Sequence, residues 1–375
     1  MEYMQYRKRV KQRPAAMQIA PGVAALALAL VACTQRASTA PVVVDDVSTT
    51  SASETPRDGR VVLITIDGAR WQDVFQGSDP GFSGAPSIPP EQLMPRAHAL
   101  VATRGVALGA PRDGCATVHT AGASNVSLPG YLEIFTGHAS HCLDNACSQV
   151  EETVLDEGAR DDQVSVASIG SWETLSRAVS NGSSGVTVAV GRDWPDAAPV
   201  TGHLADLVEA GRNADPYPGI EGYRPDAATA AIALEYFRVN KPALFHIGLG
   251  DTDEYGHRSN YGAYLTALAL ADSVIGSIAD ILDTMGEDGA KTTVIVTPDH
   301  GRNSDFTNHG VFRPESGRTF VLAFGARVAV QGIACPTRDY TLADIAPTIR
   351  VLMGLPKDRA DGAGRAIDLI TEPRP

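Results

Sequence analysis

The sequence predicts an α/β fold in which a mostly parallel central sheet has helices on both faces. From residue 60 onward, short runs rich in β-branched residues alternate with longer stretches of helical periodicity. Most of these short runs are almost wholly apolar, as expected for strands covered on both sides. There is no internal repeat and no long linker after residue 60, so we expect residues 60–375 to form one domain.

Six segments have the composition of buried strands, and six others have the apolar spacing of helices. The strand segments are Val61–Ile66, Val164–Ile169, Val186–Val190, Ala243–Leu249, Thr293–Thr297 and Thr319–Phe324. The helical segments fall at about 91–104, 128–136, 149–158, 226–239, 260–285 and 342–353. Because ligands bind beyond the carboxyl ends of strands in such sheets, the polar residues after each strand are candidate site residues.

The first 59 residues have the composition of a leader and a tether. Basic residues at 7–13 precede the apolar run Gly22–Ala32, which is too short to span a bilayer but has the length of a signal-peptide core. The run ends at Cys33, and the segment Leu-Val-Ala-Cys resembles the bacterial lipobox, in which the cysteine is lipidated. A stretch rich in Ser, Thr, Ala and Pro follows.

We therefore expect residues 1–32 to be a signal peptide, Cys33 to carry a lipid, and residues 33–59 to be a flexible tether. The protein would then be an exported periplasmic or cell-surface lipoprotein, anchored to a bacterial membrane through Cys33. The alternative is an ordinary signal peptide that happens to contain a cysteine.

The net charge argues against binding to duplex nucleic acid. The total is −13, but the first 32 residues carry +4, which leaves −17 on the remainder of the chain. Proteins that bind the phosphate backbone do so through clustered Lys and Arg, and this remainder has only three lysines. If the protein acts on anionic substrates, a bound metal ion is one way to attract them.

Besides Cys33 the chain has four cysteines, an even number that suggests two disulfides in an exported protein. Three pairings are open. Cys142 and Cys147 are close enough in sequence to close a small loop, and Cys115 and Cys335 would then form the other pair. The sequence has no Cys-x-x-Cys zinc signature.

Two strand ends carry candidate metal ligands. Asp67 directly follows the strand Val61–Ile66, where a lone Asp is also a common turn or cap residue. Asp253 and His257 follow the strand Ala243–Leu249 and are four residues apart, which places them on one face of a helical turn. An exposed acidic loop is the alternative for this second pair.

A third strand end adds Asp299 and His300, and His309 follows in a Gly-bounded loop. The alternative for the adjacent pair is a helix cap beside an exposed histidine. Together the three strand ends supply three Asp and three His, a ligand mixture that suits zinc best, with manganese or iron as alternatives. Six such ligands are enough for two divalent ions with open coordination positions.

Ser127 is the candidate nucleophile. It precedes the helical stretch 128–136, and we expect it to be the N-cap of that helix, with Pro129 in the first turn. Capping alone is one interpretation. In the other, the helix N-terminus attracts an anionic phosphoryl group, and metal coordination activates the serine, which is otherwise a weak nucleophile.

In their order along the chain, these segments resemble the alkaline phosphatase superfamily, and most closely its nucleotide pyrophosphatase/phosphodiesterase-like branch. The resemblance spans about residues 60 to 370 and implies the three-layer α/β/α fold of that superfamily. The matching segments are Ile66-Asp67-Gly68, Ser127-Leu128-Pro129 with Thr136-Gly137, Asp253 to His257, Asp299-His300-Gly301, His309-Gly310, and Leu342 to Thr348 with Met353-Gly354.

The resemblance implies roles for these residues. Asp253, His257 and His309 would hold one ion, and Asp67, Asp299 and His300 would hold the other, with Ser127 on or near it. The two ions, about 4 Å apart, would clamp the attacking and leaving oxygens of an in-line displacement. Ser127 would form a covalent phosphoseryl enzyme that water then hydrolyses.

The sequence departs from the family pattern at several positions. Most relatives in this branch have Thr as nucleophile and often His where Tyr131 stands. Monoesterase relatives carry a Lys-x-Arg pair where this chain has Ile169-Gly170-Ser171-Trp172, which favours a diester or another substrate of lower charge here. Asn145 lies in a loop where relatives place a phosphate-binding Asn, although a turn between Cys142 and Cys147 also explains it. Tyr131 replaces the Arg of the formylglycine sulfatase motif, which disfavours that class.

The predicted function is a two-metal hydrolase of phosphoric esters, either a phosphodiesterase or a phosphatase, acting on a small-molecule ester. One alternative is a phosphoryl-group transferase or mutase of the same superfamily, and another is a sulfate ester hydrolase. A further alternative is a surface lipoprotein that uses the fold only for binding. The presence of all six candidate ligands argues against this last interpretation.

Overall fold

The centre of the fold is a sheet of eight strands with β1 (Arg60–Ile66) near its middle. The computed structural model describes residues 59–84, 86–148, 151–160, 164–196, 198–356 and 363–371. The predicted signal peptide, Cys33 and the tether lie outside these residues. In spatial order the other strands are β10 (Gly332–Ile333), β2 (Gly105–Leu108), β9 (Val321–Gly325) and β7 (Thr292–Thr297) on one side of β1, and β6 (Leu244–Leu249), β4 (Val166–Gly170) and β5 (Thr187–Val190) on the other.

The sheet is mixed but mostly parallel, because β1, β4, β5, β6 and β7 all run in one direction. The strand β9 lies antiparallel to both of its neighbours, β7 and β2. Three short strands form a separate small sheet, in the order β11 (Tyr340–Thr341), β3 (Val118–His119) and β8 (Arg318–Thr319). The predicted α/β class and mostly parallel sheet are confirmed.

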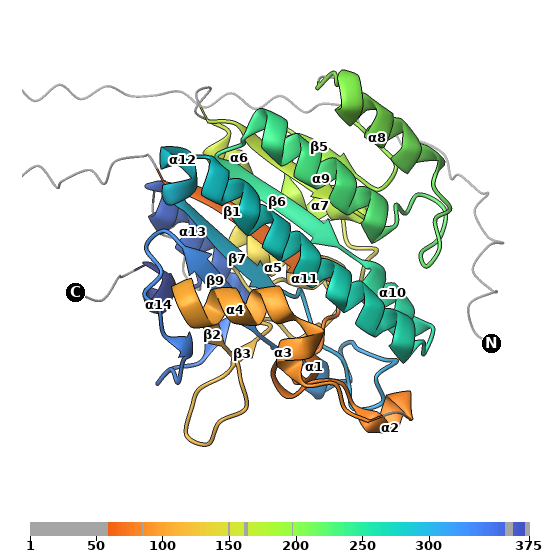
Figure 1. Cartoon of the computed structure of the whole chain (residues 1–375), viewed down its shortest axis with the longest axis vertical. Helices are drawn as coiled ribbons and strands as arrows, with labels where there is room; N and C mark the ends of the chain where they lie inside the picture. The colour runs from red at the N-terminus through yellow and green to blue at the C-terminus, as the bar shows by residue number, and fades with distance from the viewer. Residues whose placement is uncertain are drawn as a thin grey trace, which may run out of the picture. The chain divides into compact units, whose positions relative to one another are not determined.

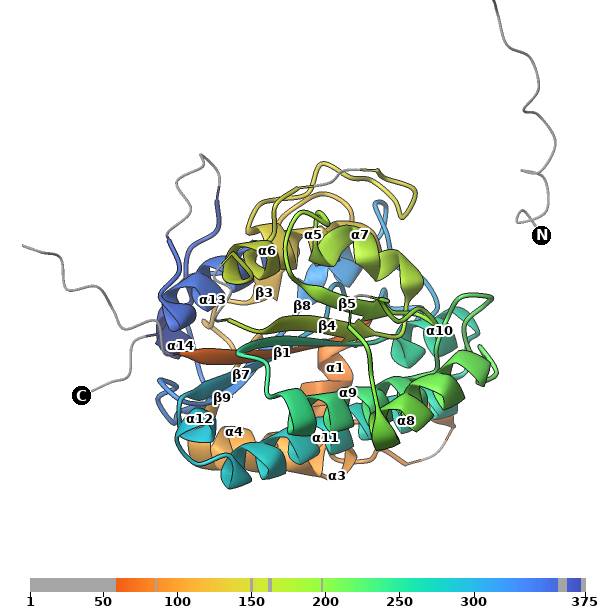
Figure 2. The same ribbon diagram turned by 90° about the horizontal axis from the view of Figure 1, so that it is seen from above.

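Helices cover both faces of the sheet, and the edge-on view in Figure 2 separates the two layers. One layer holds α4 (Pro95–Arg104), α8 (Gly202–Asn213), α9 (Asp226–Asn240), α11 (Tyr261–Thr284) and α12 (Glu287–Ala290). The other holds α5 (Ser127–Thr136), α6 (Val154–Gly158), α7 (Ser176–Val179) and α13 (Ile345–Met353). The remaining helices are α1 (Trp71–Gln76), α2 (Pro80–Ser83), α3 (Pro90–Leu93), α10 (Asp251–His257) and α14 (Asp368–Thr371), with 3₁₀ turns at Glu173–Leu175, Pro314–Gly317 and Leu342–Asp344.

The side chains of β1 divide between the two layers, as the two-residue period of a strand requires. Val62, Ile64 and Ile66 belong to the apolar core on the α11 side, whereas Val61 and Leu63 belong to the core on the α5 side. By the same alternation, Asp67, the residue directly after the strand, lies on the α5 side. The first candidate ligand is thereby aimed at the helix that carries Ser127.

All six predicted strand segments form strands, but Thr319–Phe324 is divided. Its start belongs to β8 of the small sheet and the rest to β9 of the large one. The helix predicted at 149–158 is shorter, because Thr153 and Asp156 form a capping box that starts α6 at Val154. Several shorter elements and the helix α8 were not predicted. The strand β2, for example, has only four residues.

The helix α11 is long and apolar enough to cross a membrane by length and composition alone. In the structure it packs against α4, α9 and β1, and 56% of its most apolar window is buried inside the fold. Its apolar stripe is therefore core, as the helical spacing predicted.

The structure joins Cys115 to Cys335 and Cys142 to Cys147. The Cα atoms of the two pairs are 4.8 and 5.7 Å apart, within the usual range for disulfides. The second bond closes a loop of the chain shortly after α5, and this loop contains Asn145.

The prediction that Ser127 caps α5 is wrong. Val126 is the N-cap, and Ser127 is the first residue inside the helix, with its hydroxyl turned to other partners. Every residue of α5 is buried. The helix reaches the carboxyl edge of the sheet so closely that a Cβ on Gly130 would overlap the carbonyl oxygen of Asp299. A glycine at this position therefore lets the Ser127 helix approach the end of β7.

Replacing Gly130 with Ala is expected to lower the free energy of unfolding by about 1–3 kcal/mol, because the added methyl group meets backbone that cannot rotate away. The matched control is Gly262→Ala, on an exposed turn of α11 where the nearest atom is 4.0 Å from the added Cβ. That change should be neutral or stabilising by up to about 1 kcal/mol. Urea denaturation of both variants measures the difference, and equal effects would contradict the packing argument.

Candidate metal centre and active site

The parallel register brings three strand ends to one edge of the sheet. Ile66 of β1 pairs with Leu249 of β6, and Thr65 pairs with Thr297 of β7, so the segments after these strands start side by side. The backbone N–H of Asp67 donates to the carbonyl of Leu249 at 2.9 Å, which fixes the first junction. All the sequence-predicted metal ligands follow from these three ends.

Asp67, Asp299 and His300 form one cluster, in which one possible ligand atom from each lies within 4.8 Å of the others. The Nε2 atom of His300 is 3.4 Å from Asp67 Oδ1 and 3.5 Å from Asp299 Oδ2. All three side chains are buried. The backbone N–H of Gly68 donates to Asp299 Oδ1 at 3.1 Å and leaves Oδ2 facing the cluster.

Asp253 and His309 belong to the neighbouring cluster, in which His300 supplies the third possible ligand atom within 4.8 Å, and His257 contacts both of them. Asp253 and His257 lie on one face of α10, with His257 Nε2 3.0 Å from Asp253 Oδ2. His309 Nε2 is 2.9 Å from His257 Nε2 and 3.6 Å from Asp253 Oδ1. The ring of His300 stacks on that of His309 at 3.9 Å between centroids, which joins the two clusters.

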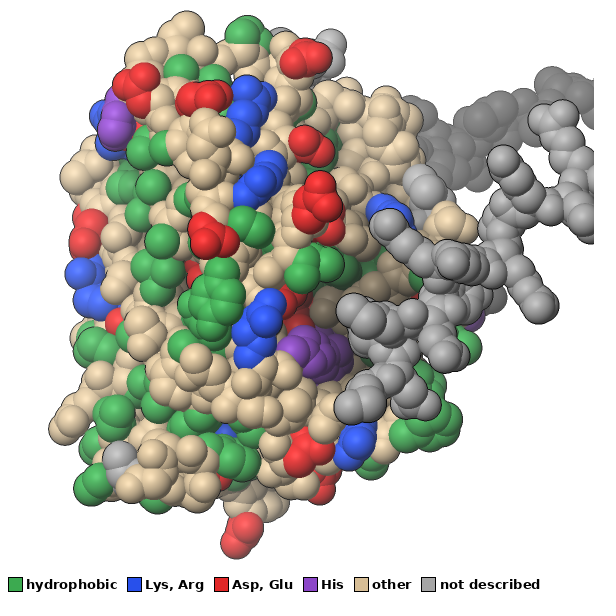
Figure 3. All heavy atoms as spheres, turned by 90° about the vertical axis from the view of Figure 1, so that its right-hand side faces the viewer, with side chains coloured by type: hydrophobic (Ala, Val, Ile, Leu, Met, Phe, Trp, Pro, Cys, Tyr) green, Lys and Arg blue, Asp and Glu red, His purple; other side chains and the backbone are tan. Residues whose placement is uncertain are grey.

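This centre opens on the side of the molecule where α10 lies in Figure 1. On that face, histidine side chains gather beside a hollow (Figure 3). The side chain of His257 is 46% exposed, whereas that of His300 is fully buried. Access from solvent is therefore through the Asp253 cluster, with the Asp67 cluster deeper.

The imidazoles are oriented for metal binding by their second nitrogens. His300 Nδ1 lies 2.8 Å from the carbonyl oxygen of Gly301, and His309 Nδ1 lies 2.8 Å from that of Asn125. A carbonyl only accepts, so each Nδ1 carries the proton and each Nε2 presents a lone pair. Burial lowers the pKa of both histidines, His300 the more strongly, and this keeps the rings neutral.

The two clusters differ in electrostatics. Burial and the repulsion between neighbouring carboxylates raise the pKa of Asp67 and of Asp299 well above the usual value. Burial would also raise the pKa of Asp253, but Arg302, His257 and His309 lower it well below its usual range. Among the described residues, Asp299 Oδ2 has no hydrogen-bond partner. A buried, unpartnered carboxylate oxygen beside neutral imidazoles fits a bound cation.

Ser127 lies at the deeper cluster. Its Oγ is 3.4 Å from Asp67 Oδ1 and 3.2 Å from His300 Nε2. Since α5 begins at this residue, its hydroxyl sits between the first turn of the helix and two of the candidate ligands. An ion held by Asp67 and His300 would therefore be next to the nucleophile.

Asn145 reaches the same helix from the disulfide-closed loop. Its Oδ1 accepts a hydrogen bond from the backbone N–H of Leu128 at 2.9 Å and so acts as the cap that Val126 does not provide. With the oxygen engaged, the amide NH₂ is the group that remains to donate. The turn and substrate-binding interpretations of Asn145 are thus compatible, because its amide oxygen serves the first and its NH₂ group the second.

Arg302 is a site residue that the sequence did not predict. Its guanidinium is buried and contacts Asp253 Oδ1. An Arg two residues after His300 has no distinguishing spacing, and an isolated Arg is exposed far more often than buried. The only sequence signal was its position directly after the Asp299-His300-Gly301 segment.

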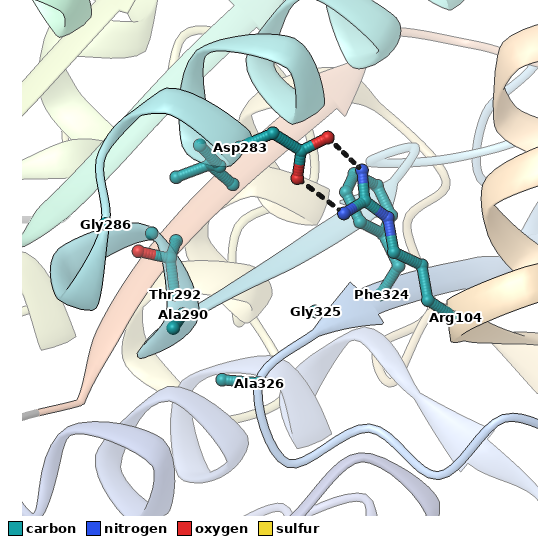
Figure 4. Close-up of a pocket in the computed structure, with 10 residues that line it drawn as sticks. Arg104, Asp283, Gly286, Ala290, Thr292, Phe324, Gly325 and Ala326 are labelled. Atoms are coloured by element: carbon teal, nitrogen blue, oxygen red, sulfur yellow. Dashed lines mark hydrogen bonds and ion pairs between the residues drawn. The ribbon is translucent and has the colours of Figure 1, made fainter.

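The pocket in Figure 4 is not part of this centre. It is lined by Arg104, Asp283, Phe324 and neighbouring small residues, and it has a volume of about 390 Å³. It lies where β7 begins, at Thr292, and therefore at the opposite end of the strands from Asp299. The Arg104–Asp283 ion pair occupies its polar side, at 2.7 Å.

The chain is similar to known proteins in part of its sequence and in its fold. Residues 200–357, which include five of the six candidate ligands, match the family model of the metalloenzyme superfamily. A 2,3-bisphosphoglycerate-independent phosphoglycerate mutase from Synechococcus elongatus is 31% identical over 140 residues, which are 35% of this chain and 24% of the mutase. The match thus spans about a quarter of the length of that relative.

Solved structures extend the likeness to most of the chain. A 2-O GAG sulfatase has a TM-score of 0.54 at 14% identity, over 84% of this chain and 75% of that one. A mutant of the alkaline phosphatase PafA has a TM-score of 0.55 at 12% identity, over 84% of this chain and 99% of that one. At these identities the likeness shows the fold.

The charge of the deeper cluster leads to a prediction about stability. A carboxyl group whose pKa is raised in the folded state holds a proton that the unfolded chain has already released. The metal-free protein should therefore lose stability as the pH rises above about 4, through the raised pKa values of Asp67 and Asp299. Added zinc should remove this loss.

Asp299→Asn tests the same point. It removes one repelling charge and should raise the metal-free stability at pH 7 by about 1 kcal/mol or more, because a buried charge without a partner is costly. It should also reduce the stabilisation that zinc provides. The control is Asp280→Asn, at an exposed carboxylate that pairs with Arg96. Thermal unfolding with chelator and with zinc measures both effects, and a less stable metal-free Asp299→Asn protein would count against the argument.

Residues 200–357 thus match the metalloenzyme superfamily, and the described chain has a fold similar to that of an alkaline phosphatase.

Proposed function

We propose that the protein is a two-metal hydrolase of phosphoric esters, with Ser127 as its nucleophile and a phosphodiester as the favoured substrate. The observation that carries the proposal is the position of Ser127 Oγ, within 3.4 Å of Asp67 and 3.2 Å of His300. The nucleophile is thereby beside one candidate ion position, with the second position next to it.

Asp67, Asp299 and His300 would hold one divalent ion, and Asp253, His257 and His309 the other. Zinc suits this mixture of carboxylate and imidazole best, and manganese is the alternative. Bound ions would lower the pKa of the Ser127 hydroxyl and neutralise the charge of the phosphate. This supplies the positive charge that the acidic body of the protein lacks.

The chain's own residues set the geometry of the reaction. Ser127 Oγ attacks phosphorus, the bond to the leaving alcohol breaks, and a phosphoseryl enzyme forms. Water then breaks the Ser127–phosphorus bond and restores the hydroxyl. The backbone N–H of Leu128 holds the Oδ1 atom of Asn145, so the NH₂ group of Asn145 donates to a phosphate oxygen.

The end of β4 supports a diester over a monoester. The segment Ile169–Trp172 carries no Lys or Arg, and the Ser171 hydroxyl is buried and donates to Asp226 at 2.6 Å. Trp172 is partly exposed, and its ring lies 6.4 Å from that of Tyr131, one turn after Ser127. An aromatic side chain in this place suits the organic group of a diester better than a second negative charge.

Two other activities are alternatives for the same site. The partial likeness to a phosphoglycerate mutase favours a phosphoryl transfer in which an alcohol replaces water. The likeness to a sulfatase fold favours sulfate ester hydrolysis, although Tyr131 stands where the formylglycine motif needs Arg. We also propose that the protein acts at a bacterial membrane, held through a lipid on Cys33.

Ser127→Ala is expected to reduce turnover of an aryl phosphodiester by at least about a thousandfold, because the covalent route is lost. Metal content and thermal stability should stay near those of the wild type. Mass spectrometry of acid-quenched wild-type enzyme should find the phosphoryl adduct on Ser127. The control is Ser124→Ala, since that hydroxyl donates to the Leu143 carbonyl and not to the ligands. Near-full activity of Ser127→Ala would rule out the mechanism.

The role of Asn145 is tested by a pair of variants. Asn145→Asp keeps an oxygen for the Leu128 N–H, so stability should be unchanged, but it replaces the donor with a negative charge that repels phosphate. We expect KM to rise by about tenfold or more. Asn145→Ala loses both functions and should also reduce stability by about 1 kcal/mol.

Kinetics with matched methyl and phenyl diesters, a monoester, a sulfate ester and an added acceptor alcohol also separate the candidate activities. Unchanged KM in Asn145→Asp would exclude the phosphate contact.

A further inference from the structure

Arg302 is held by the fold in one position beside the metal ligands. Its guanidinium contacts Asp253 Oδ1 and donates to the carbonyl oxygens of Phe306 and Thr307, to the latter at 2.7 Å. All three guanidinium nitrogens therefore have acceptors. The side chain links α10 to the loop that leads to His309.

Two glycines make room for this cation. A Cβ on Gly256 of α10 would overlap the guanidinium carbon, and one on Gly68 would lie 2.8 Å from Nη1 and overlap Asp253 Oδ1. Gly68 also has a φ of +60°, which other residues adopt rarely. The space around Arg302 is thus formed by residues on both sides of the metal centre.

The result is an unequal distribution of charge. In the outer cluster, Asp253 is the only carboxylate, and Arg302 already compensates it. In the inner cluster, Asp67 and Asp299 both lie against His300 Nε2 and repel one another, and Asp299 Oδ2 has no hydrogen-bond partner within the described part of the chain. A divalent ion therefore gains far more from the inner cluster than from the outer one.

We propose that Arg302 is a resident cation that makes the Asp253–His257–His309 position the weaker and exchangeable of the two ion positions. Without an ion, it holds Asp253 and the His309 loop in the binding arrangement. An ion that enters this position meets a fixed positive charge in a buried setting, where repulsion is strong. Arg302 contacts Asp253 and, within the described residues, no ligand of the Asp67–Asp299–His300 position, so the inner position is less opposed and fills first. This inference rests on the proposed metal-dependent function.

Zinc titration of the chelator-treated protein tests the proposal by calorimetry and metal analysis. The wild type should bind one ion tightly and a second more weakly, and turnover should follow the weaker step. His257→Ala should abolish the weaker step, and Asp299→Asn should abolish or weaken the tighter one. Arg302→Met and Arg302→Gln, which are both neutral, should tighten the weaker step by at least about tenfold. Arg302→Lys should stay near the wild type.

Arg313→Met is the matched control, because Arg313 is an exposed cation later in the same loop that pairs with Asp305. It changes the net charge equally and should leave both steps unchanged. If the neutral variants fold only with zinc, competition with a chelator measures the weaker step in the folded protein. Unchanged or weaker binding in both neutral variants, or two equal steps in the wild type, would overturn the proposal. A wild type that binds no ion would instead contradict the proposed function.

Discussion

Three buried carboxylates at one sheet edge are the constraint on which the rest of the site depends. The parallel pairing of β6, β1 and β7 ends the strands side by side, so Asp67, Asp253 and Asp299 follow neighbouring strand ends. Buried negative charges this close together destabilise the folded state unless a cation or a proton compensates them. Arg302 compensates one of them within the fold. The other two are left for a metal ion.

The nucleophile is held against this edge by packing rather than by capping. Gly130 lets α5 touch the backbone of Asp299, and Asn145 satisfies the first turn from outside the helix. Ser127 is therefore free to turn its hydroxyl toward Asp67 and His300 instead of toward its own helix. A serine that capped the helix could not do both.

The sequence pointed to the candidate ligands because their patterns are local. Asp67 follows a buried strand, and Asp253 and His257 are spaced by one helical turn, so both patterns are visible in short windows. Arg302 escaped notice because its burial depends on Gly68, Gly256 and the 302–309 loop meeting in space. The prediction that Ser127 is an N-cap failed for a similar reason, since its cap came from Asn145 in another segment. Short sequence windows show residue types and their spacing, whereas contacts between distant segments decide which side chains interact.

The central claim is that two divalent ions occupy the two clusters around Ser127. Anomalous diffraction at the zinc edge, from crystals of the protein grown with zinc, tests it most directly. The account predicts two peaks, one among Asp67, Asp299 and His300 and one among Asp253, His257 and His309. The second peak should have the lower occupancy at limiting zinc. Crystals with no peak at either cluster, or with zinc bound only elsewhere, would contradict the account.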